Sequence, residues 1–372
     1  HILPYWEDFP ISAKDSVSHL DQIRKKVAAA FPNKDILIGE TGFPSAGRMR
    51  EGAEPSPSNQ AKVIHDIIAL SKRDNFRVNV IEAFDQPWKR QLEGTVGGHW
   101  GLFDADSRAF KFAWGEPVSD HPFWQRQIIG GVLMAVLVFG AAMLGGIRMT
   151  SAMFAPVSSW IGVAIVAGTA GIFVPLAAEK LPLESLGVSG WVRGGVMFVL
   201  ALACPLAVSA AIMRERSIPA FASVLTRRPT AFDCRLTPAL GLLLVALTLA
   251  AVLVALGLVF DPRYKDFPYA PLTAAIVPFF VLSLLATVAK GPRALAEHVA
   301  AVGLLLSLTY IAFNESFANW QALWLCALLA LLAVTLSMAR DAQEKGSEDR
   351  RQAPTSRRYK AQSRTRPRSA RS

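Results

Sequence analysis

Residues 127–147 have the sequence QIIGGVLMAVLVFGAAMLGGI, which contains no charged side chain. A stretch of about 20 apolar residues is the length that an α-helix needs to cross a bilayer. The stretch also marks a step in composition, because residues 1–120 have the mixed composition of a soluble domain, while 127–339 consist mainly of long apolar runs. We therefore expect a domain boundary near His121–Gln127 and a membrane domain over residues 121–339.

Six further apolar stretches follow, and with the first they predict about seven transmembrane helices. They lie near 157–178, 190–213, 237–259, 271–289, 294–313 and 318–338. The stretch 294–313 is the weakest, because Glu297 and His298 stand in its first turn. Ionisable groups inside a bilayer are candidates for function, but these two lie near a helix end, where a structural role is the simpler interpretation. One helix would tether a domain, so seven indicate a further role, such as a path or a partner surface for a polymer.

The net charge of +10 combines −2 over residues 1–120 with +7 over residues 340–372. Loops rich in Lys and Arg stay on the cytoplasmic side of a membrane, and the rich loops here are 148–156, 214–236 and 290–293. With seven spans, this pattern places the tail in the cytoplasm. It places residues 1–120 in the periplasm, on the outer face of a bacterial inner membrane. Residues 340–372 are expected to be a basic disordered tail near anionic lipid, so the high pI does not indicate nucleic-acid binding.

The three cysteines, Cys204, Cys234 and Cys326, all follow residue 120. Residues 1–120 therefore have neither a disulfide framework nor a cysteine-based zinc site. No Gly-rich phosphate loop is present, and we expect no cofactor and no metal ion. The chain begins at His1 without a signal peptide, and we expect its natural N-terminus to lie upstream.

Residues 1–120 alternate short apolar segments with amphipathic ones, the pattern of parallel β/α units. Strands are expected at 1–5, 35–38 and 78–84, and helices at 12–31 and 56–72. In a barrel of such units, the C-terminal ends of the strands form the active-site face. The predicted fold class is therefore α/β, followed by an all-α transmembrane domain.

Each expected strand ends in a cluster of acidic and aromatic residues. The three clusters are Pro4-Tyr5-Trp6-Glu7, Gly39-Glu40-Thr41-Gly42-Phe43 and Glu82-Ala83-Phe84-Asp85-Gln86-Pro87-Trp88-Lys89. Carboxylates beside aromatic rings suit a carbohydrate site, since rings stack on sugar faces and carboxylates act on the glycosidic bond. The residues alone leave a second interpretation open, in which each Trp is a packing residue and Glu82 is the buried partner of a Lys or Arg.

The run ILIGETGFPSAG, residues 36–47, resembles the signature of glycoside hydrolase family 17, which contains β-1,3-glucanases and glucanosyltransferases. Phe43 stands where that family typically has Trp. The runs FDQPWK (84–89) and WGLFD (100–104) resemble the family's segment after the last barrel strand. The resemblance covers about residues 1–117. With the trailing spans, the arrangement is similar to bacterial membrane proteins described as β-(1→6)-glucan synthases.

The resemblance implies that Glu40 is the catalytic nucleophile, at the end of the seventh barrel strand. It implies a substrate-binding group around it, comprising Tyr5, Trp6, Glu82, Asp85, Trp88, Lys89, Glu93 and Trp100. Within this group Lys89 and Glu93 lie near the reaction centre, while Tyr5, Trp6 and Trp100 line sugar subsites. Gln86 departs from the family, where many members carry Glu.

The family's general acid/base is a Glu in an Asn-Glu pair, and residues 1–120 contain no such pair. A complete (β/α)8 TIM barrel needs about 250 residues. We therefore expect residues 1–120 to be the C-terminal part of a barrel whose first five strands precede His1. The chain of residues 1–372 is then expected to be inactive by itself.

The function implied is that of a membrane-anchored enzyme that remodels β-1,3/β-1,6-glucans, as a retaining hydrolase or a transglycosylase, through a glycosyl-enzyme on Glu40. Its expected partners are a β-glucan polysaccharide or oligosaccharide, the lipid bilayer and proteins of glucan synthesis. The alternative is a non-catalytic sugar-binding scaffold or a transport subunit of a glucan export system. A plain transporter fits less well, because the spans show no internal repeat.

Overall fold

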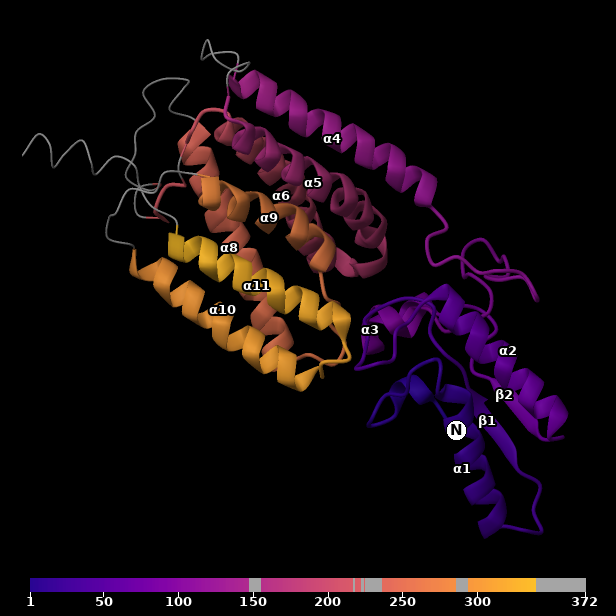
Figure 1. Ribbon diagram of the computed structural model, residues 1–372. Coiled ribbons are helices and arrows are strands. Elements are labelled where there is room, and N and C mark those ends of the chain that lie inside the picture. Colours follow the sequence, from indigo (N-terminus) through magenta and orange to yellow (C-terminus); the bar gives the residue numbers. More distant parts are fainter. Residues whose placement is uncertain (147–154, 217, 222–223, 225–235, 286–293, 339–372) are drawn as a thin grey trace, which may run out of the picture.

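A computed structural model describes residues 1–146, 155–216, 218–221, 224, 236–285 and 294–338. It consists of a bundle of long helices and a smaller α/β unit that lies at one end of the bundle (Figure 1). The α/β unit is built from residues before 121, and irregular chain then leads into the first long helix.

The α/β unit contains two parallel strands, β1 (Leu37–Thr41) and β2 (Arg77–Val80), with Ile38 beside Val78. The crossover between them is α2 (Pro57–Arg73), so the expected β/α unit is present. The only named sheet of the described residues has two strands, and they do not form a closed barrel. The expected strand at residues 1–5 is also wrong, because Pro4–Trp6 form a 3-10 helix, η1.

Local sequence accounts for where α2 and α1 begin. Ser56 caps α2, because its Oγ accepts a hydrogen bond from the backbone N–H of Asn59 at 3.2 Å, and Pro57 fits the first turn. Helix α1 (Ser16–Ala30) begins four residues later than expected, because the carbonyl of Ser12 accepts the N–H of Asp15 and of Ser16 in a turn. Helix α2 packs on β2, and α1 packs on α2 and on η1. The core of the unit includes Tyr5, Leu20, Ile38, Phe43, Val63, Ile67 and Trp100.

Seven long helices of the described residues form the bundle. They are α4 (Trp124–Gly146), α5 (Val157–Glu184), α6 (Gly187–Ile212), α8 (Leu236–Phe260), α9 (Tyr269–Leu285), α10 (Leu295–Asn314) and α11 (Trp320–Met338). All except α9 are long and apolar enough to cross a membrane. Helix α9 has 17 residues, and the end of the expected span 271–289 lies outside the described residues. The six helices indicate a membrane protein.

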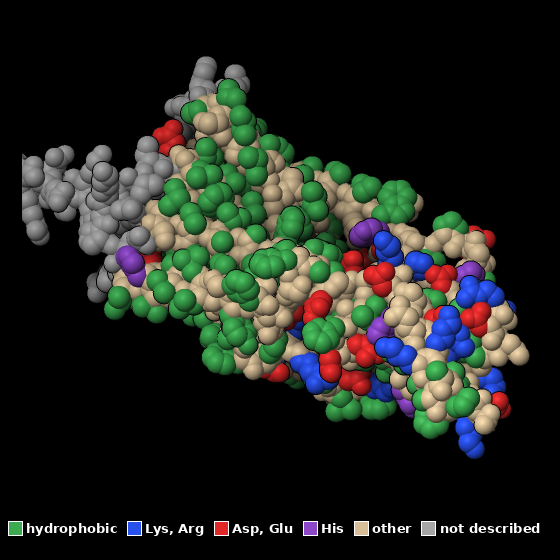
Figure 2. Space-filling model, turned by 60° about the horizontal axis from the view of Figure 1, so that its bottom comes forward, with side chains coloured by type: hydrophobic (Ala, Val, Ile, Leu, Met, Phe, Trp, Pro, Cys, Tyr) green, Lys and Arg blue, Asp and Glu red, His purple; other side chains and the backbone are tan. Residues whose placement is uncertain are grey.

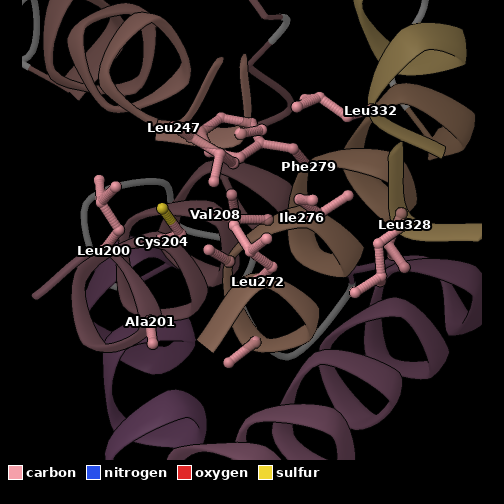
Figure 3. Packing of buried hydrophobic residues seen from close by; sticks show 14 of the residues in the cluster. Leu200, Ala201, Cys204, Val208, Leu247, Leu272, Ile276, Phe279, Leu328 and Leu332 are labelled. Carbon is pink, nitrogen blue, oxygen red and sulfur yellow. The ribbon is translucent and has the colours of Figure 1, made fainter. Parts of the chain in front are cut away.

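The interior of the bundle is apolar, and its outer surface is apolar as well. Leu200, Val208, Ile276 and Phe279 pack together between the helices (Figure 3). Figure 2 shows hydrophobic side chains spread over the outside of the bundle, whereas Lys, Arg, Asp and Glu gather over the α/β unit. An apolar outer surface is what a lipid environment requires. Glu297 is fully buried and accepts hydrogen bonds from the backbone N–H groups of Ala294 (3.0 Å) and Phe221 (3.3 Å), which is a structural role.

The α/β unit is joined to the bundle by polar contacts between groups distant in sequence. Arg48 Nη2 lies 2.5 Å from Glu315 Oε2, and both side chains are buried. The backbone of Met49 is held from both sides, because its N–H donates to Gln321 Oε1 and its carbonyl accepts from Asn319 Nδ2, both at 3.0 Å. These residues place the loop that follows β1 directly against the start of α11. The bundle is therefore packed against the α/β unit rather than connected to it only through the chain.

Candidate functional site

Glu40 lies near the C-terminal end of β1, and its side chain is 32% exposed. Its Oε2 is 2.5 Å from Nδ1 of His1, while its backbone carbonyl accepts the N–H of Ile2 at 2.9 Å. The first residues of the chain therefore run beside β1. The carboxylate faces outward at the edge where both parallel strands end, so it is accessible to a ligand.

Glu82 follows β2, just as Glu40 lies near the end of the neighbouring strand β1. Its Oε1 accepts a hydrogen bond from Lys89 Nζ at 2.5 Å, and its side chain is buried. Burial raises the pKa of Glu82, and the hydrogen bond and charge of Lys89 oppose that rise. Its second oxygen is buried without a hydrogen-bond partner among the described residues.

Lys89 is the positive centre of this group. Burial lowers its pKa, but the hydrogen bond from Lys89 to Glu82 and the negative charges of Glu82, Glu93 and Glu40 outweigh burial and raise the pKa overall. The lysine thus interacts electrostatically with all three carboxylates. Glu82 holds the ammonium in place, and Glu40 is more accessible than Glu82, with 32% of its side chain exposed against 6%. This arrangement can present Glu40 as a nucleophile beside a fixed positive charge.

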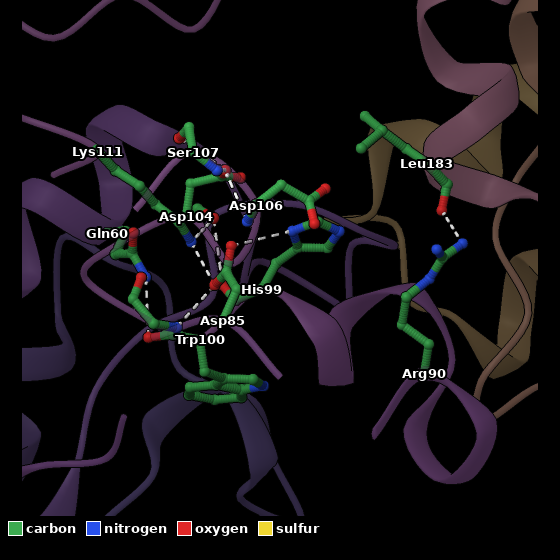
Figure 4. Close-up of polar contacts among 12 residues, drawn as sticks. Gln60, Asp85, Arg90, His99, Trp100, Asp104, Asp106, Ser107, Lys111 and Leu183 are labelled. Carbon is green, nitrogen blue, oxygen red and sulfur yellow. Dashed lines mark hydrogen bonds and ion pairs between the residues drawn. The ribbon is translucent and has the colours of Figure 1, made fainter. Parts of the chain in front are cut away.

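Asp85, a predicted substrate-binding residue, lies in a different environment. Its Oδ1 accepts hydrogen bonds from the N–H of Gly101 (2.9 Å) and from Lys111 Nζ (2.6 Å), and its Oδ2 lies 3.6 Å from His99 Nδ1 (Figure 4). Only 4% of its side chain is exposed. Burial lowers the pKa of Lys111, an effect that the charge of Asp85 opposes. The structure places Asp85 in a closed network that fixes the chain after β2.

The four predicted aromatic residues divide into two buried and two accessible rings. Tyr5 and Trp100 are 0% and 1% exposed, and the Tyr5 hydroxyl donates to the carbonyl of Arg48 at 2.8 Å. Burial raises the pKa of Tyr5. Trp6 is partly buried and stacks on Trp100 with 6.5 Å between ring centroids, whereas Trp88 is 58% exposed. Trp6 and Trp88 therefore keep accessible surface, and Tyr5 and Trp100 pack against Trp6 from the core.

The structure adds residues that the sequence did not indicate. Arg50 lies over the ring of Trp6 at 5.1 Å, and Tyr264, from the loop between α8 and α9, meets the same ring at 6.0 Å between centroids. His1 was missed as the neighbour of Glu40. Tyr264 is more than 250 positions away from Trp6, and no local sequence pattern connects the two. The contact between them could therefore not be predicted from the sequence. His1 stands next to an apolar run and resembles any residue at a chain end.

Residues 1–101 match the profile of the BtgE/BtgC glycoside hydrolase domain. A glucan 1,3-beta-glucosidase of Saccharomyces cerevisiae is 38% identical over 106 residues, which are 27% of this chain and 34% of that protein. Glucan 1,3-beta-glucosidase BGL2 of Candida albicans is 30% identical over 109 residues, 27% of this chain and 35% of that protein. Probable beta-glucosidase btgE of Aspergillus fumigatus is 33% identical over 95 residues, covering 25% of this chain and 16% of its own.

A solved structure, an active-site mutant of Rhizomucor miehei beta-1,3-glucanosyltransferase in complex with laminaritriose, is 27% identical and covers 32% of this chain and 40% of its own. Its TM-score of 0.27 is too low to establish a shared fold. The chain spans about a third of the length of the first two relatives. The matched region contains both strands and the Glu40–Lys89 group. Residues 1–101 are thus similar to a glycoside hydrolase domain whose relatives are glucan 1,3-beta-glucosidases.

Proposed function

We propose that this protein is a membrane-anchored enzyme that remodels β-1,3/β-1,6-glucans, with Glu40 as its catalytic nucleophile. One observation supports this most directly. Glu40 is an accessible carboxylate near the C-terminal end of β1, and its negative charge acts on Lys89, whose ammonium the buried Glu82 holds at 2.5 Å. This group lies in the part of the chain that is similar to glucan 1,3-beta-glucosidases.

The proposed mechanism is that of a retaining family 17 glycosidase. Glu40 attacks the anomeric carbon as the glycosidic bond breaks, and a proton from a second carboxyl about 5–5.5 Å away goes to the leaving oxygen. Water or a hydroxyl of a second glucan then attacks the anomeric carbon of the glycosyl ester, its proton goes to the second carboxylate, and the bond to Glu40 breaks and frees its carboxylate. Water gives hydrolysis, and the glucan hydroxyl gives transglycosylation. The chain's own contributions are the nucleophile and the charge of Lys89 beside it.

We place the remaining predicted residues around Glu40 by their exposure. Trp6 and Trp88 stack on sugar rings, because they keep accessible surface, and Glu93 contributes a polar contact near Lys89. Tyr5, Trp100, Glu82 and Asp85 hold the site together from within. The substrate is a β-glucan polysaccharide or oligosaccharide, and glucan-synthesis proteins are the proposed partners.

The proposed architecture is a (β/α)8 barrel to which residues 1–120 contribute its C-terminal units, followed by a membrane domain (121–339) and a basic cytoplasmic tail (340–372). The helix ends that meet the α/β unit belong to loops poor in Lys and Arg. That agreement supports a periplasmic position for residues 1–120, on a bacterial inner membrane.

The test uses the full natural protein, purified in detergent and incubated with laminari-oligosaccharides. Product masses are compared for the wild type, Glu40→Gln and the control Glu116→Gln, which removes an exposed carboxylate elsewhere in the same unit. We expect Glu40→Gln to lose at least about 10³-fold in rate, the scale on which removal of a nucleophile acts. Longer or branched products of the wild type indicate a transglycosylase, and shorter ones alone indicate a glucanase. Unchanged sugars with every protein would contradict the proposal and favour a sugar-binding scaffold.

A further inference from the structure

Two cavities join at the end of the bundle that faces the α/β unit. The inner one, about 410 Å³, lies between α5, α6 and α8, and most of its wall is apolar, including Met197, Phe198, Leu253 and Leu258. The outer one, about 430 Å³, is more polar, and its lining includes Arg90, Gln91, Thr95 and Asp261. Both are bordered by Glu184, Gly190, Arg193, Lys265 and Asp266. The two form one cleft with a polar mouth and an apolar interior.

The acidic groups of this cleft have partners within the protein, whereas one of its cations has none among the described residues. Each acid has a partner in the protein: Glu184 lies 3.5 Å from Lys180, Asp261 lies 3.1 Å from Lys265, and Asp266 accepts the hydroxyl of Thr95 at 2.6 Å. Arg193 is exposed, and no hydrogen bond or salt bridge joins it to any residue that the structure describes. The cleft thus offers one guanidinium to a ligand.

Arg90 adds a second cation to the polar mouth, and its guanidinium forms no salt bridge with an acid in the part of the chain that the structure describes. Its Nη2 donates to the carbonyls of Leu183 (2.5 Å) and Ser185 (3.1 Å), at the turn between α5 and α6 (Figure 4). Three cations and three acids line the mouth, but neither Arg90 nor Arg193 forms a salt bridge with a carboxylate of the described residues. A guanidinium without such a partner favours a phosphate, which Arg binds with two parallel hydrogen bonds.

The position of the cleft in the molecule further restricts the kind of ligand that it can bind. It opens at the point where α5 ends and α6 begins. Lipid head groups meet transmembrane helices at the level of such helix ends. A free phosphate or sugar would leave the apolar interior empty. A lipid would fill both parts, its head group against Arg193 and its chain between α6 and α8.

We infer that this cleft binds a phospholipid, with its phosphate paired to Arg193 and its acyl chain in the apolar interior. Helix α3 (Arg90–Glu93) forms part of the polar mouth and continues directly from Lys89. A bound lipid therefore touches the helix next to the Glu40–Lys89 group. The inference stands independently of the proposed glucan chemistry.

The experiment titrates phosphatidylglycerol into the full chain in detergent and follows the melting temperature. Arg193→Gln is compared with Arg126→Gln, which removes an exposed cation at the same end of the bundle. We expect the lipid to raise the melting temperature of the wild type and of Arg126→Gln alike. In Arg193→Gln, half of the effect should require at least about tenfold more lipid, since a hydrogen-bonded charge contributes about 1.5–3 kcal/mol.

Two further probes test the two parts of the cleft. Leu253→Trp fills the interior from a position that is 68% exposed, so it should weaken the lipid effect without unfolding the bundle. Glycerol 3-phosphate tests the phosphate alone, and a monoglucosyl diacylglycerol tests a lipid without phosphate. Both should stabilise the wild type far less than phosphatidylglycerol. Equal stabilisation by either, or an Arg193→Gln response equal to that of Arg126→Gln, would overturn the assignment.

Discussion

Two acidic groups follow neighbouring strands of the same sheet, yet their surroundings are opposite. Glu40, at the end of β1, keeps about a third of its side chain exposed and faces His1 and the Lys89 group. Asp85, after β2, is almost fully buried and contacts Gly101, Lys111 and His99. The first group has carboxylate oxygens left for a ligand, and the second has used them for the fold. Residue type and position after a strand do not distinguish Glu40 from Asp85. The number of groups that bind each carboxylate within the protein does.

The sharpest test of this difference is Asp85→Ala beside Glu40→Ala. Loss of Asp85 leaves Lys111 buried without its partner, and breaking a buried pair typically costs about 3–5 kcal/mol. Loss of Glu40 should change the free energy of unfolding by less than about 0.5 kcal/mol. Melting curves of the purified variants give both values. Lys111→Met combined with Asp85→Ala should recover part of the loss, and equal losses for Glu40 and Asp85 would break the distinction.

A smaller effect is expected at Gly101, where the Asp85 network approaches the backbone closely. A Cβ at this position would lie 2.1 Å from the backbone nitrogen of Asp85 and 2.2 Å from the carbonyl carbon of Phe84. Gly101→Ala should therefore destabilise the unit by about 1–3 kcal/mol, as overpacking does. Gly52→Ala is the control, since its nearest neighbour would be a side-chain atom of Ser12 at 3.9 Å. A Gly101→Ala protein as stable as the control would show that this approach is not fixed.

The smallest expected effect concerns pH and the Lys89–Glu82 pair. Burial raises the pKa of Glu82 above 4.5, so the folded state loses stability as the pH rises from that value through the raised pKa. Lys89→Met removes the group that opposes this rise, so the loss should extend to higher pH. Melting temperatures measured across this range test the shift. In Glu82→Gln/Lys89→Met the pH dependence should disappear, and its persistence would assign it to another group.

Sequence patterns predicted the parts of this molecule that depend on local periodicity. The apolar runs located the seven bundle helices of the described residues, and the amphipathic pattern of residues 56–72 located α2. Patterns could not predict contacts between distant segments. Arg48 meets Glu315 across more than 260 residues, and neither has a local sequence context that indicates a partner. The burial of Tyr5 and Trp100 also depends on such contacts, which is why their sequence resembled that of exposed sugar-binding rings.

The central claim is that Glu40 forms a covalent bond to a sugar, and trapping that bond tests it most directly. The full natural protein is incubated with a 2-deoxy-2-fluoro laminaribioside that carries an activated leaving group, so that no proton donor is needed for the first step. The masses of the tryptic peptides are then measured by mass spectrometry. Our account predicts a disaccharide adduct on the peptide of residues 35–48, which contains Glu40. An adduct on residues 78–89, which contain Glu82, or no adduct on any peptide, would contradict it.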